Sequence, residues 1–566
     1  MRALSILLIA ASIDAADTKD RDLAVGEVNF ATSGGREAQI HFVRGVAALH
    51  SFWYEEALEE FRRATKIDPS FAMGYWGEAM AHNHPIWGDP QNTEAAKKAL
   101  AQIKEGQKLI PRERAYIDAV KALYGQGDKA NRDRLYAEAM QRLHRQYPDD
   151  LEGTAFYALA LLGSAAAGPP GQRRRMEAAA LASEVIGKKP NHPGATHYLI
   201  HAFDDPDHAI LALPAARKYA KVAPDAYHAL HMPSHIFLQL GMWPEAAASN
   251  EAAWAASKKS VAQRRLPRSM HDYHSLHWLI YVYLQQGRYR EAEELLGRMR
   301  KSLDDLGDDP FRRLFILFLY STMAGIFVVE TERWDIASTL AEPLQARLAA
   351  QASQPGDGAK HGSGSHGQPA IPDHKMVPGL LRAPLVFAQG LAAATKGNES
   401  RESIADLEKI SKAPAIPVEA LSEMPKVANI QQLEIAAAYH ASKSRFEEAI
   451  RDAKKAAEME QSLAAPMGPP VLLKPANELY GEILLRAGRA EEAAQQFAIA
   501  LTRHPNRGRS LLGAARTAAK RGDATAAGAA YSKFLNQWKN ADPASAELSE
   551  ALAHSKGESA AKAPGR

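Results

Sequence analysis

The run His192-Pro-Gly-Ala-Thr-His197-Tyr-Leu-Ile-His201-Ala-Phe-Asp204 is the first of three histidine-rich runs that organise this chain of 566 residues. The second is His228-Ala-Leu-His231-Met-Pro-Ser-His235, and the third is His271-Asp-Tyr-His274-Ser-Leu-His277-Trp-Leu-Ile-Tyr281. The stretch from His192 to His277 contains ten of the chain's 21 histidines, nine of them in these three runs. Each run predicts the first helix of a helical hairpin, closed by a second helix rich in small residues.

A recurring string follows the second and third runs and supplies the hairpin turn. It reads Gly241-Met-Trp-Pro-Glu-Ala-Ala in one case and Gly287-Arg-Tyr-Arg-Glu-Ala-Glu in the other. This string resembles the tetratricopeptide repeat (TPR), a hairpin of about 34 residues with small residues near its eighth and twentieth places. The chain as a whole resembles exported bacterial TPR proteins. The resemblance covers residues 38–541 with gaps. It implies an all-α fold, a right-handed α-solenoid of TPR-like helical hairpins.

The repeat frame gives the histidines fixed places. Aligning Ala246 and Ala292 on the twentieth place predicts repeats at 193–226, 227–260 and 273–306. The residues of interest then fall on the second place (His228, His274), the fifth (His197, His231, His277), the ninth (His201, His235, Tyr281) and the twelfth (Asp204). These places share one helix face because a turn takes 3.6 residues. By the TPR resemblance this face lines the concave groove, so a groove lined with imidazoles is predicted.

Histidines four apart on one helix face can chelate a single ion. The predicted metal ligands are His197, His201, Asp204, His228, His231, His235, His274 and His277. The sharpest hypothesis joins His201, His231 and His235 in one site, with Asp204 as a carboxylate ligand. Such a donor set suits a divalent transition metal, namely Zn, Fe, Cu or Ni. The chain has no cysteine, so thiolate ligands are excluded.

Pro233 lies between the two histidines of the second pair. Because proline lacks a backbone N–H, the helix is expected to start late or to bend at this point. A bend beside two imidazoles favours a site that specifies backbone geometry.

Other interpretations of the same residues remain open. A groove lined by His, Tyr and Trp also fits a peptide or an acidic ligand, which would make the protein an interaction scaffold with no metal and no catalysis. Duplication of one structural histidine would give the same pattern. Tyr281, Glu478 and Glu482 are predicted to face the groove as further ligand residues, the two glutamates from a late repeat at 474–507. Whether any reaction is catalysed is undecided, because no His-Glu-x-x-His, Walker, dinucleotide-binding or Gly-x-Ser-x-Gly motif occurs.

The predicted organisation has seven parts. They are a signal peptide (1–15), N-terminal TPR-like hairpins (38–150), central histidine-rich repeats (151–306), a helical hairpin (307–350), a flexible Gly/Ser/His-rich insertion (351–376), C-terminal TPR repeats (377–541) and a polar tail (542–566).

Composition limits the classes of partner. The net charge is +3, from 69 basic and 66 acidic residues, so electrostatics give no case for nucleic acid. After the N-terminus no stretch approaches 18 uninterrupted apolar residues, so no membrane span is expected. A protein or peptide partner is compatible with the TPR resemblance.

The N-terminal segment predicts export, with the periplasm as the destination. Arg2 precedes an apolar run from Ala3 to Ala11, and Ala15 offers a small residue for cleavage. We therefore expect the mature chain to begin near Ala16. N-terminal sequencing of exported material tests this expectation, and an intact Met1 in the soluble cytosolic fraction would contradict it.

Overall fold

The structure, a computed structural model, is helical throughout the residues it describes. These are 23–86, 91–104, 109–165, 168–307, 309–353, 377–413, 423–464 and 466–555. The predicted signal peptide and residues 354–376 of the predicted insertion lie outside them. Residues 351–353 belong to the end of a helix.

Antiparallel helix pairs follow one another along the chain, each helix packing on the next and, in several places, on the next but one. The N-terminal helices are α1 (Arg36–His50), α2 (Tyr54–Ile67), α3 (Ala72–Met80), α4 (Thr93–Leu100), α5 (Pro111–Leu123), α6 (Lys129–Gln146), α7 (Leu151–Gly163) and α8 (Pro169–Lys188). The central helices are α9 (Pro193–Ala202), α10 (Ala209–Val222), α11 (Tyr227–His231), α12 (Pro233–Gln239), α13 (Trp243–Gln263), α14 (Tyr273–Gln285) and α15 (Tyr289–Ser302). First helices thus begin at the residues where the three repeats were predicted to start.

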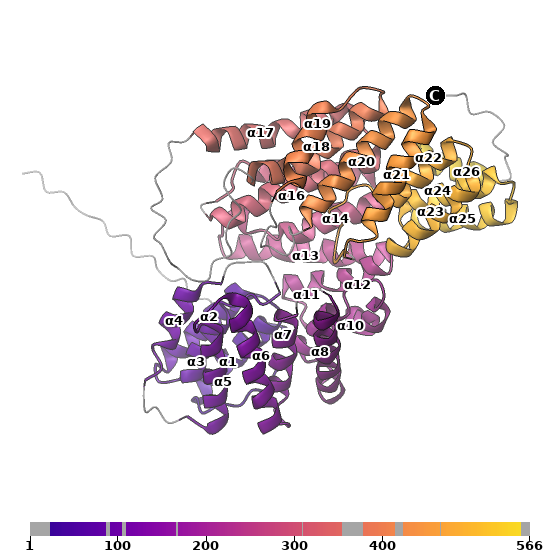
Figure 1. The fold of residues 1–566 in the computed structure, drawn as a ribbon. Coiled ribbons are helices and arrows are strands. Elements are labelled where there is room, and N and C mark those ends of the chain that lie inside the picture. Colours follow the sequence, from indigo (N-terminus) through magenta and orange to yellow (C-terminus); the bar gives the residue numbers. More distant parts are fainter. Residues whose placement is uncertain are drawn as a thin grey trace, which may run out of the picture.

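The C-terminal part continues the same pattern. Its helices are α16 (Pro310–Thr331), α17 (Ala337–Ser353), α18 (Val377–Thr395), α19 (Arg401–Ser411), α20 (Met424–Ser442), α21 (Phe446–Glu460), α22 (Ala476–Arg486), α23 (Ala490–Arg503), α24 (Gly508–Lys520), α25 (Ala524–Gln537) and α26 (Ala546–Ser555). The protein is therefore an all-α solenoid of TPR-like hairpins. Figure 1 shows the N-terminal helices α1 to α8 as one lobe and α16 to α26 as another, with α11 and α12 at the junction.

Helix α26 corrects the predicted polar tail. Ala551 is fully buried against α25, and Glu550 pairs with Arg516 of α24 at 2.7 Å. The sequence pattern hid this helix because isolated contacts, rather than an apolar stripe, attach it to the last hairpin. His554 also stacks on Tyr531 with ring centres 4.3 Å apart, and the Tyr531 hydroxyl donates to Glu550 at 3.0 Å.

Small residues allow the hairpins to approach each other. The ring of Phe61 in α2 lies between α1 and α3, where a Cβ at Gly45 or Gly77 would come within 2.7 or 2.3 Å of it. Phe497 of α23 lies between α22 and α24 in the same way. A Cβ at Gly481 would come within 3.0 Å of its ring, and one at Gly513 within 2.2 Å. The glycine of the repeat is therefore a packing requirement.

Two helices are long and apolar enough to span a membrane by length and mean hydropathy, α16 at 1.9 and α18 at 1.3. The length of uninterrupted apolar runs predicts no such candidate, because isolated polar residues interrupt both segments. In the most apolar 18-residue segment of each helix, 78% of α16 and 67% of α18 is buried inside the protein. The two helices pack on each other and on α14 and α20, so their apolar surface forms the core of the solenoid.

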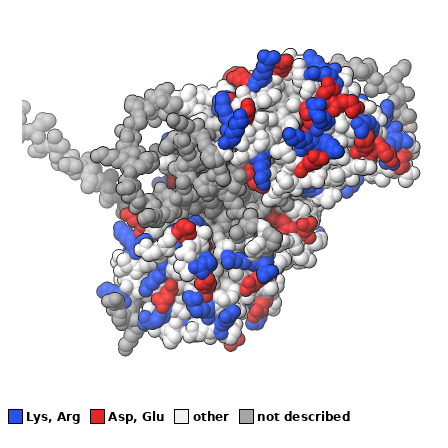
Figure 2. All heavy atoms as spheres, in the orientation of Figure 1, with Lys and Arg blue, Asp and Glu red and all other residues white. Residues whose placement is uncertain are grey.

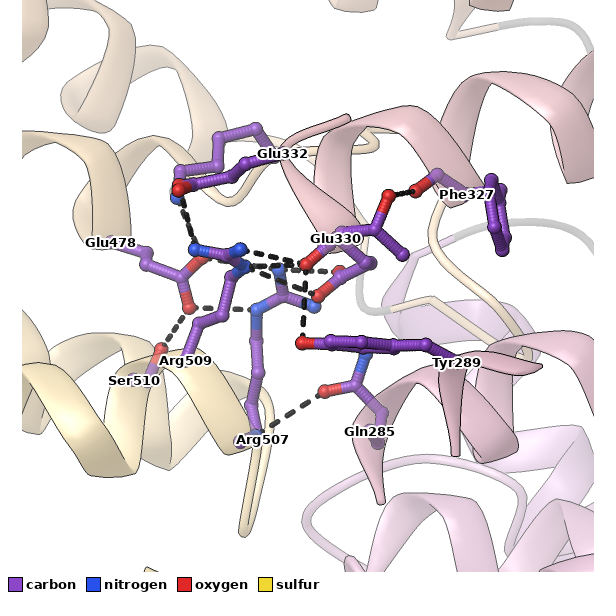
Figure 3. A network of polar contacts seen from close by, with 12 residues as sticks. Gln285, Tyr289, Phe327, Glu330, Glu332, Glu478, Arg507, Arg509 and Ser510 are labelled. Carbon is purple, nitrogen blue, oxygen red and sulfur yellow. Dashed lines mark hydrogen bonds and ion pairs between the residues drawn. The ribbon is translucent and has the colours of Figure 1, made fainter. Parts of the chain in front are cut away.

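The C-terminal repeats fold back onto the central ones. The indole of Trp243 donates to the carbonyl of Asn506 at 2.8 Å, and Gly241 lies so close to Pro505 that a Cβ would come within 2.2 Å of its carbonyl oxygen. Beside this contact the Arg507 guanidinium is fully buried between Glu478 and Glu330, at 2.8 and 2.6 Å (Figure 3). A buried arginine needs both carboxylates to offset its desolvation. The network thus fixes α24 against α16 and α22.

The surface on the face shown in Figure 2 mixes basic and acidic side chains. This distribution agrees with the small net charge of +3.

We expect Gly513→Ala to lower the free energy of unfolding by about 1–3 kcal/mol, because the new methyl group overlaps the ring of Phe497. Gly528 in α25 has nothing within 4 Å of a Cβ. Gly528→Ala should therefore stabilise the protein by roughly 0.5–1 kcal/mol through helix propensity. Thermal unfolding followed by circular dichroism measures both changes, and equal melting temperatures would contradict this packing account.

Candidate metal centre

Helix α9 presents His197 and His201 one turn apart. It begins at Pro193, directly after His192, whose Nδ1 accepts a hydrogen bond from the backbone N–H of Ala195 at 3.0 Å. This cap and the N-terminal proline set the register of the helix. The two rings lie side by side, with their centres 4.7 Å apart.

Pro233 divides the next first helix, as predicted: α11 ends at His231 and α12 begins at Pro233. The division does not separate the imidazoles that flank it. The Nε2 atoms of His231 and His235 face each other at 3.1 Å. His228, one turn before His231, also lies on α11.

Helix α14 supplies His274 as its second residue. Asp272 caps this helix, since its carboxylate accepts from the backbone N–H of Ser275 at 3.1 Å. The ring of His274 lies 4.7 Å from that of His231.

Six histidines thus form two groups with metal-ligand spacing. The first triad is His197, His201 and His228, and the second triad is His231, His235 and His274. Within each triad, one ring nitrogen per residue lies within 4.8 Å of the other two. Each triad joins the fifth and ninth places of one repeat to the second place of the next. The trio of the sequence hypothesis, His201, His231 and His235, is divided between the triads, although the rings of His201 and His235 are 5.8 Å apart.

Hydrogen bonds on the outer side fix the tautomers of the second triad. His235 Nδ1 donates to the Asp204 carboxylate at 2.6 Å, and His231 Nδ1 donates to Asn250 Oδ1 at 2.7 Å. The Asn250 amide nitrogen itself donates to the carbonyl of Ala246 at 2.8 Å, which fixes its oxygen toward His231. With the protons on Nδ1, the two rings point Nε2 lone pairs at each other.

Asp204 therefore differs from its predicted role as a ligand. Its carboxylate lies behind His235 and also accepts from Gln239 Nε2 at 3.2 Å. A carboxylate that accepts from the far nitrogen of a histidine is the usual outer-shell partner of a metal-bound imidazole. The repeat frame did not predict this role, because it places Asp204 on the shared helix face without showing which atom of His235 it contacts. The carboxylate lies against Nδ1 of His235 and not in the space between the imidazole rings.

The first triad has a comparable support. His197 Nδ1 donates to the backbone carbonyl of His50 at 2.7 Å, which leaves Nε2 as the acceptor. Within the described part of the chain, the buried Nε2 atoms of His197 and His201 have no hydrogen-bond partner. A buried acceptor without a partner costs roughly 1–3 kcal/mol. A bound cation would offset that cost.

Burial keeps these imidazoles neutral. Desolvation lowers the pKa of His197 to about 3, and it lowers the pKa values of His201, His228, His231 and His274 well below 6.5. Neighbouring imidazoles lower these pKa values further. Neutral imidazole is the form that binds metal, so no proton has to leave these rings at pH 7.

The predicted open groove of imidazoles needs correction, because four of the six triad histidines are buried and only His201 and His274 are partly exposed. His197 and His231 are fully buried, and Trp278 of α14 packs on His235 with ring centres 4.2 Å apart. The segment after α21 covers this point: the carbonyl of Pro466 accepts from Gln239 at 2.8 Å, and a Cβ at Gly468 would lie 2.7 Å from Trp278. Side chains of distant repeats fill the space that the sequence assigned to a groove.

Two further predicted site residues lie outside both triads. His277 is almost fully buried on α14, and burial lowers its pKa to about 4. Tyr281, one turn further on, packs edge-to-face on Trp243 with ring centres 5.9 Å apart. Tyr281 is therefore a core residue and not part of an exposed ligand groove.

Glu478 and Glu482 are not free groove ligands either. Glu478 is fully buried and accepts from Arg507 Nε at 2.8 Å and from Ser510 at 2.5 Å (Figure 3), while Lys474 bridges both glutamates at 3.0 and 2.6 Å. Burial favours a raised pKa for Glu478, but Arg507 and Lys474 hold it below its ordinary value. Both carboxylates serve the network that joins the C-terminal repeats to α16.

A third histidine cluster was missed by the sequence analysis, because its members are far apart in the chain. Glu152 of α7 accepts from His50 Nε2 at 2.9 Å and from His192 Nε2 at 3.2 Å. His192 Nδ1 already accepts from Ala195, so its Nε2 carries the proton and donates. The Tyr198 hydroxyl lies 2.7 Å from His50 Nδ1. Every ring nitrogen is hydrogen-bonded, which makes this cluster a structural network between α1, α7 and α9.

Comparison with known proteins shows similarity in the arrangement of helices and none in sequence family. No protein family and no curated protein matches the sequence. Among solved structures, the human IFIT1 dimer with m7Gppp-AAAA aligns over 90% of this chain and 91% of its own, with 12% identity and a TM-score of 0.36. Yeast Tom70 aligns over 92% and 88%, with 11% identity and a TM-score of 0.28. The Cut9–Hcn1 hetero-tetramer aligns over 92% and 96%, with 11% identity and a TM-score of 0.24.

Acid should destabilise the fold through its buried histidines. His277 has a folded pKa of about 4, whereas the unfolded value is about 6.5. Between these values the unfolded chain binds a proton that the folded chain does not, so stability falls as pH drops from about 6.5 toward 4. We expect His277→Gln to reduce the loss of unfolding free energy between pH 7 and 4.5 by about 2 kcal/mol. Urea unfolding at the two pH values measures this, and an unchanged acid sensitivity would show that His277 is not the group responsible.

Proposed function

We propose that this protein is a metal-binding α-solenoid that holds a divalent first-row transition metal ion at the second triad, His231, His235 and His274. The single observation that carries the proposal is the approach of the His231 and His235 Nε2 atoms to 3.1 Å. Both Nδ1 atoms donate outward, to Asn250 and Asp204. Two lone pairs therefore face each other in a buried site, where they repel unless a cation lies between them.

The spacing suits one ion. Two imidazole nitrogens bound to a zinc-like ion at about 2.0–2.1 Å lie roughly 2.9–3.4 Å apart for bond angles between 90° and 110°. The third nitrogen, from His274, comes from a helix that packs on the same pair. Three protein ligands leave an open coordination position. The donors are all imidazoles, which suits Zn, Cu, Fe or Ni.

Two further features support the proposal. The hydrogen bonds to Asp204 and Asn250 hold both rings in the ligating tautomer, and burial lowers the pKa of His231 well below 6.5. The compartment is part of the same proposal: the apolar run from Ala3 to Ala11 would direct the protein to the periplasm. An interaction scaffold without metal is the alternative, and a metal-free protein is its expected result.

Equilibrium dialysis of the untagged full chain against Zn(II), with elemental analysis, tests the proposal. We expect retained zinc in the wild type and its loss in His235→Ala. His208→Ala should keep the metal, since His208 is a partly exposed histidine outside both triads whose ring pairs with Asp205. Zinc at a hundredfold excess over its dissociation constant should stabilise the wild type by roughly 2.7 kcal/mol. The absence of retained metal and of any shift in melting with Zn, Cu, Ni or Fe would refute the proposal.

Asp204→Ala distinguishes an orienting residue from a ligand. Loss of an outer-shell partner typically lowers metal affinity about 10–100-fold. We expect a drop of that size with unchanged stoichiometry, and partial recovery in Asp204→Asn, which can still accept from His235. Competition with a chromophoric chelator measures the affinities. A complete loss of binding in Asp204→Asn would make Asp204 a direct ligand.

A further inference from the structure

The first and second triads face each other. The rings of His201 and His235 are 5.8 Å apart and those of His228 and His231 are 5.9 Å apart. Rings within one triad are 4.7 to 6.4 Å apart. The ring separations between the triads thus fall within the range found inside them.

Helix α11 supplies a ligand to each triad. His228 points to the first triad and His231 to the second, and they are separated by one turn of the same helix. Side chains three residues apart on a helix have Cβ atoms about 5–6 Å apart. Ions held by the two triads must therefore be near neighbours.

We propose that the two triads form one dinuclear centre, which holds two transition-metal ions joined by a single oxygen-donor bridge. This inference rests on the proposed function and extends it to His197, His201 and His228. With three imidazoles on each ion, one position per ion stays open for the bridge. Two-metal sites in proteins place their ions about 3.5–4 Å apart, a spacing that one bridging oxygen spans. A bound water becomes the bridging hydroxide by releasing one proton to solvent.

Independent observations point to a ligand at the first triad. The Nε2 atoms of His197 and His201 are buried and lack a hydrogen-bond partner in the described structure, while His197 Nδ1 donates to the carbonyl of His50. Phe52 closes the triad, with its ring 4.4 Å from that of His197 and 5.6 Å from that of His228. An apolar wall of this kind limits access of bulk water to the bridge.

The two triads also use the same places of the repeat. Each takes the fifth and ninth residues of one first helix and the second residue of the next first helix. The same repeat places thereby bring three imidazoles together one hairpin earlier. The series stops after two, because Tyr281 occupies the ninth place of the third repeat and packs in the core.

Copper(II) is the probe of choice, because it binds nitrogen donors most tightly among the divalent first-row ions and is paramagnetic. The full-length protein is titrated with Cu(II), and bound copper is compared with the electron paramagnetic resonance signal. We expect two copper ions per chain. The signal should grow with the first equivalent and disappear with the second, because a single-atom bridge couples the two spins.

Variants separate this inference from the proposed function. His201→Ala should bind one copper ion with full signal, and His228→Gln provides the same test if the first variant folds poorly by circular dichroism. His208→Ala should behave as the wild type. Two bound ions with undiminished signal, or one ion per chain that His201→Ala leaves in place, would overturn the dinuclear centre while the second triad still binds metal. No copper bound at all would overturn both.

Discussion

Removal of imidazoles from water is the constraint on which the centre of this structure depends. Six histidines from four helices are packed together, and burial lowers the pKa of five of them, so these five fold as neutral rings and accept protons only in acid. Each neutral ring keeps one lone pair. The hydrogen bonds of Asp204, Asn250 and the His50 carbonyl use the outer nitrogens of three rings, which leaves inner nitrogens aimed at one another. This arrangement is costly for the protein alone and is favourable around cations.

The rest of the solenoid encloses this group. The N-terminal lobe contributes Phe52 and the His50 carbonyl, and the C-terminal repeats contribute the segment at Pro466 and Gly468. The Arg507 network holds those C-terminal repeats in place, since a buried guanidinium between two carboxylates tolerates little displacement. Glu478, which the sequence predicted to be a groove ligand, therefore acts on the site indirectly. It helps to hold in place the repeats whose segment at Pro466 and Gly468 covers the histidines.

Repeat periodicity accounts for how much of the site could be predicted. It placed His197, His201, His228, His231, His235 and His274 on one face and Pro233 at a helix break, and the structure brings all six together. The repeat frame also contained the grouping of the histidines into triads. Each triad takes the fifth and ninth places of one repeat and the second place of the next. This grouping was not predicted, because a sequence shows which residues pair within one helix but not how far neighbouring helices are shifted along each other. That shift depends on how the hairpins stack. The same limit explains why Asp204 was predicted to be a metal ligand, since only its helix face was known.

The sequence by itself determined the all-helical repeat, the first-helix starts at 193, 227 and 273, and the set of histidines at the centre. Local spacing carries this information, since helix periodicity and small-residue packing act over one or two turns. Tertiary structure alone decided that the histidines are divided into two largely buried triads, that Glu152 joins His50 and His192, and that α26 packs on α25. Those outcomes depend on contacts between residues up to hundreds of positions apart. The curvature that brings such residues together is the sum of many small rotations between hairpins, which no single repeat encodes.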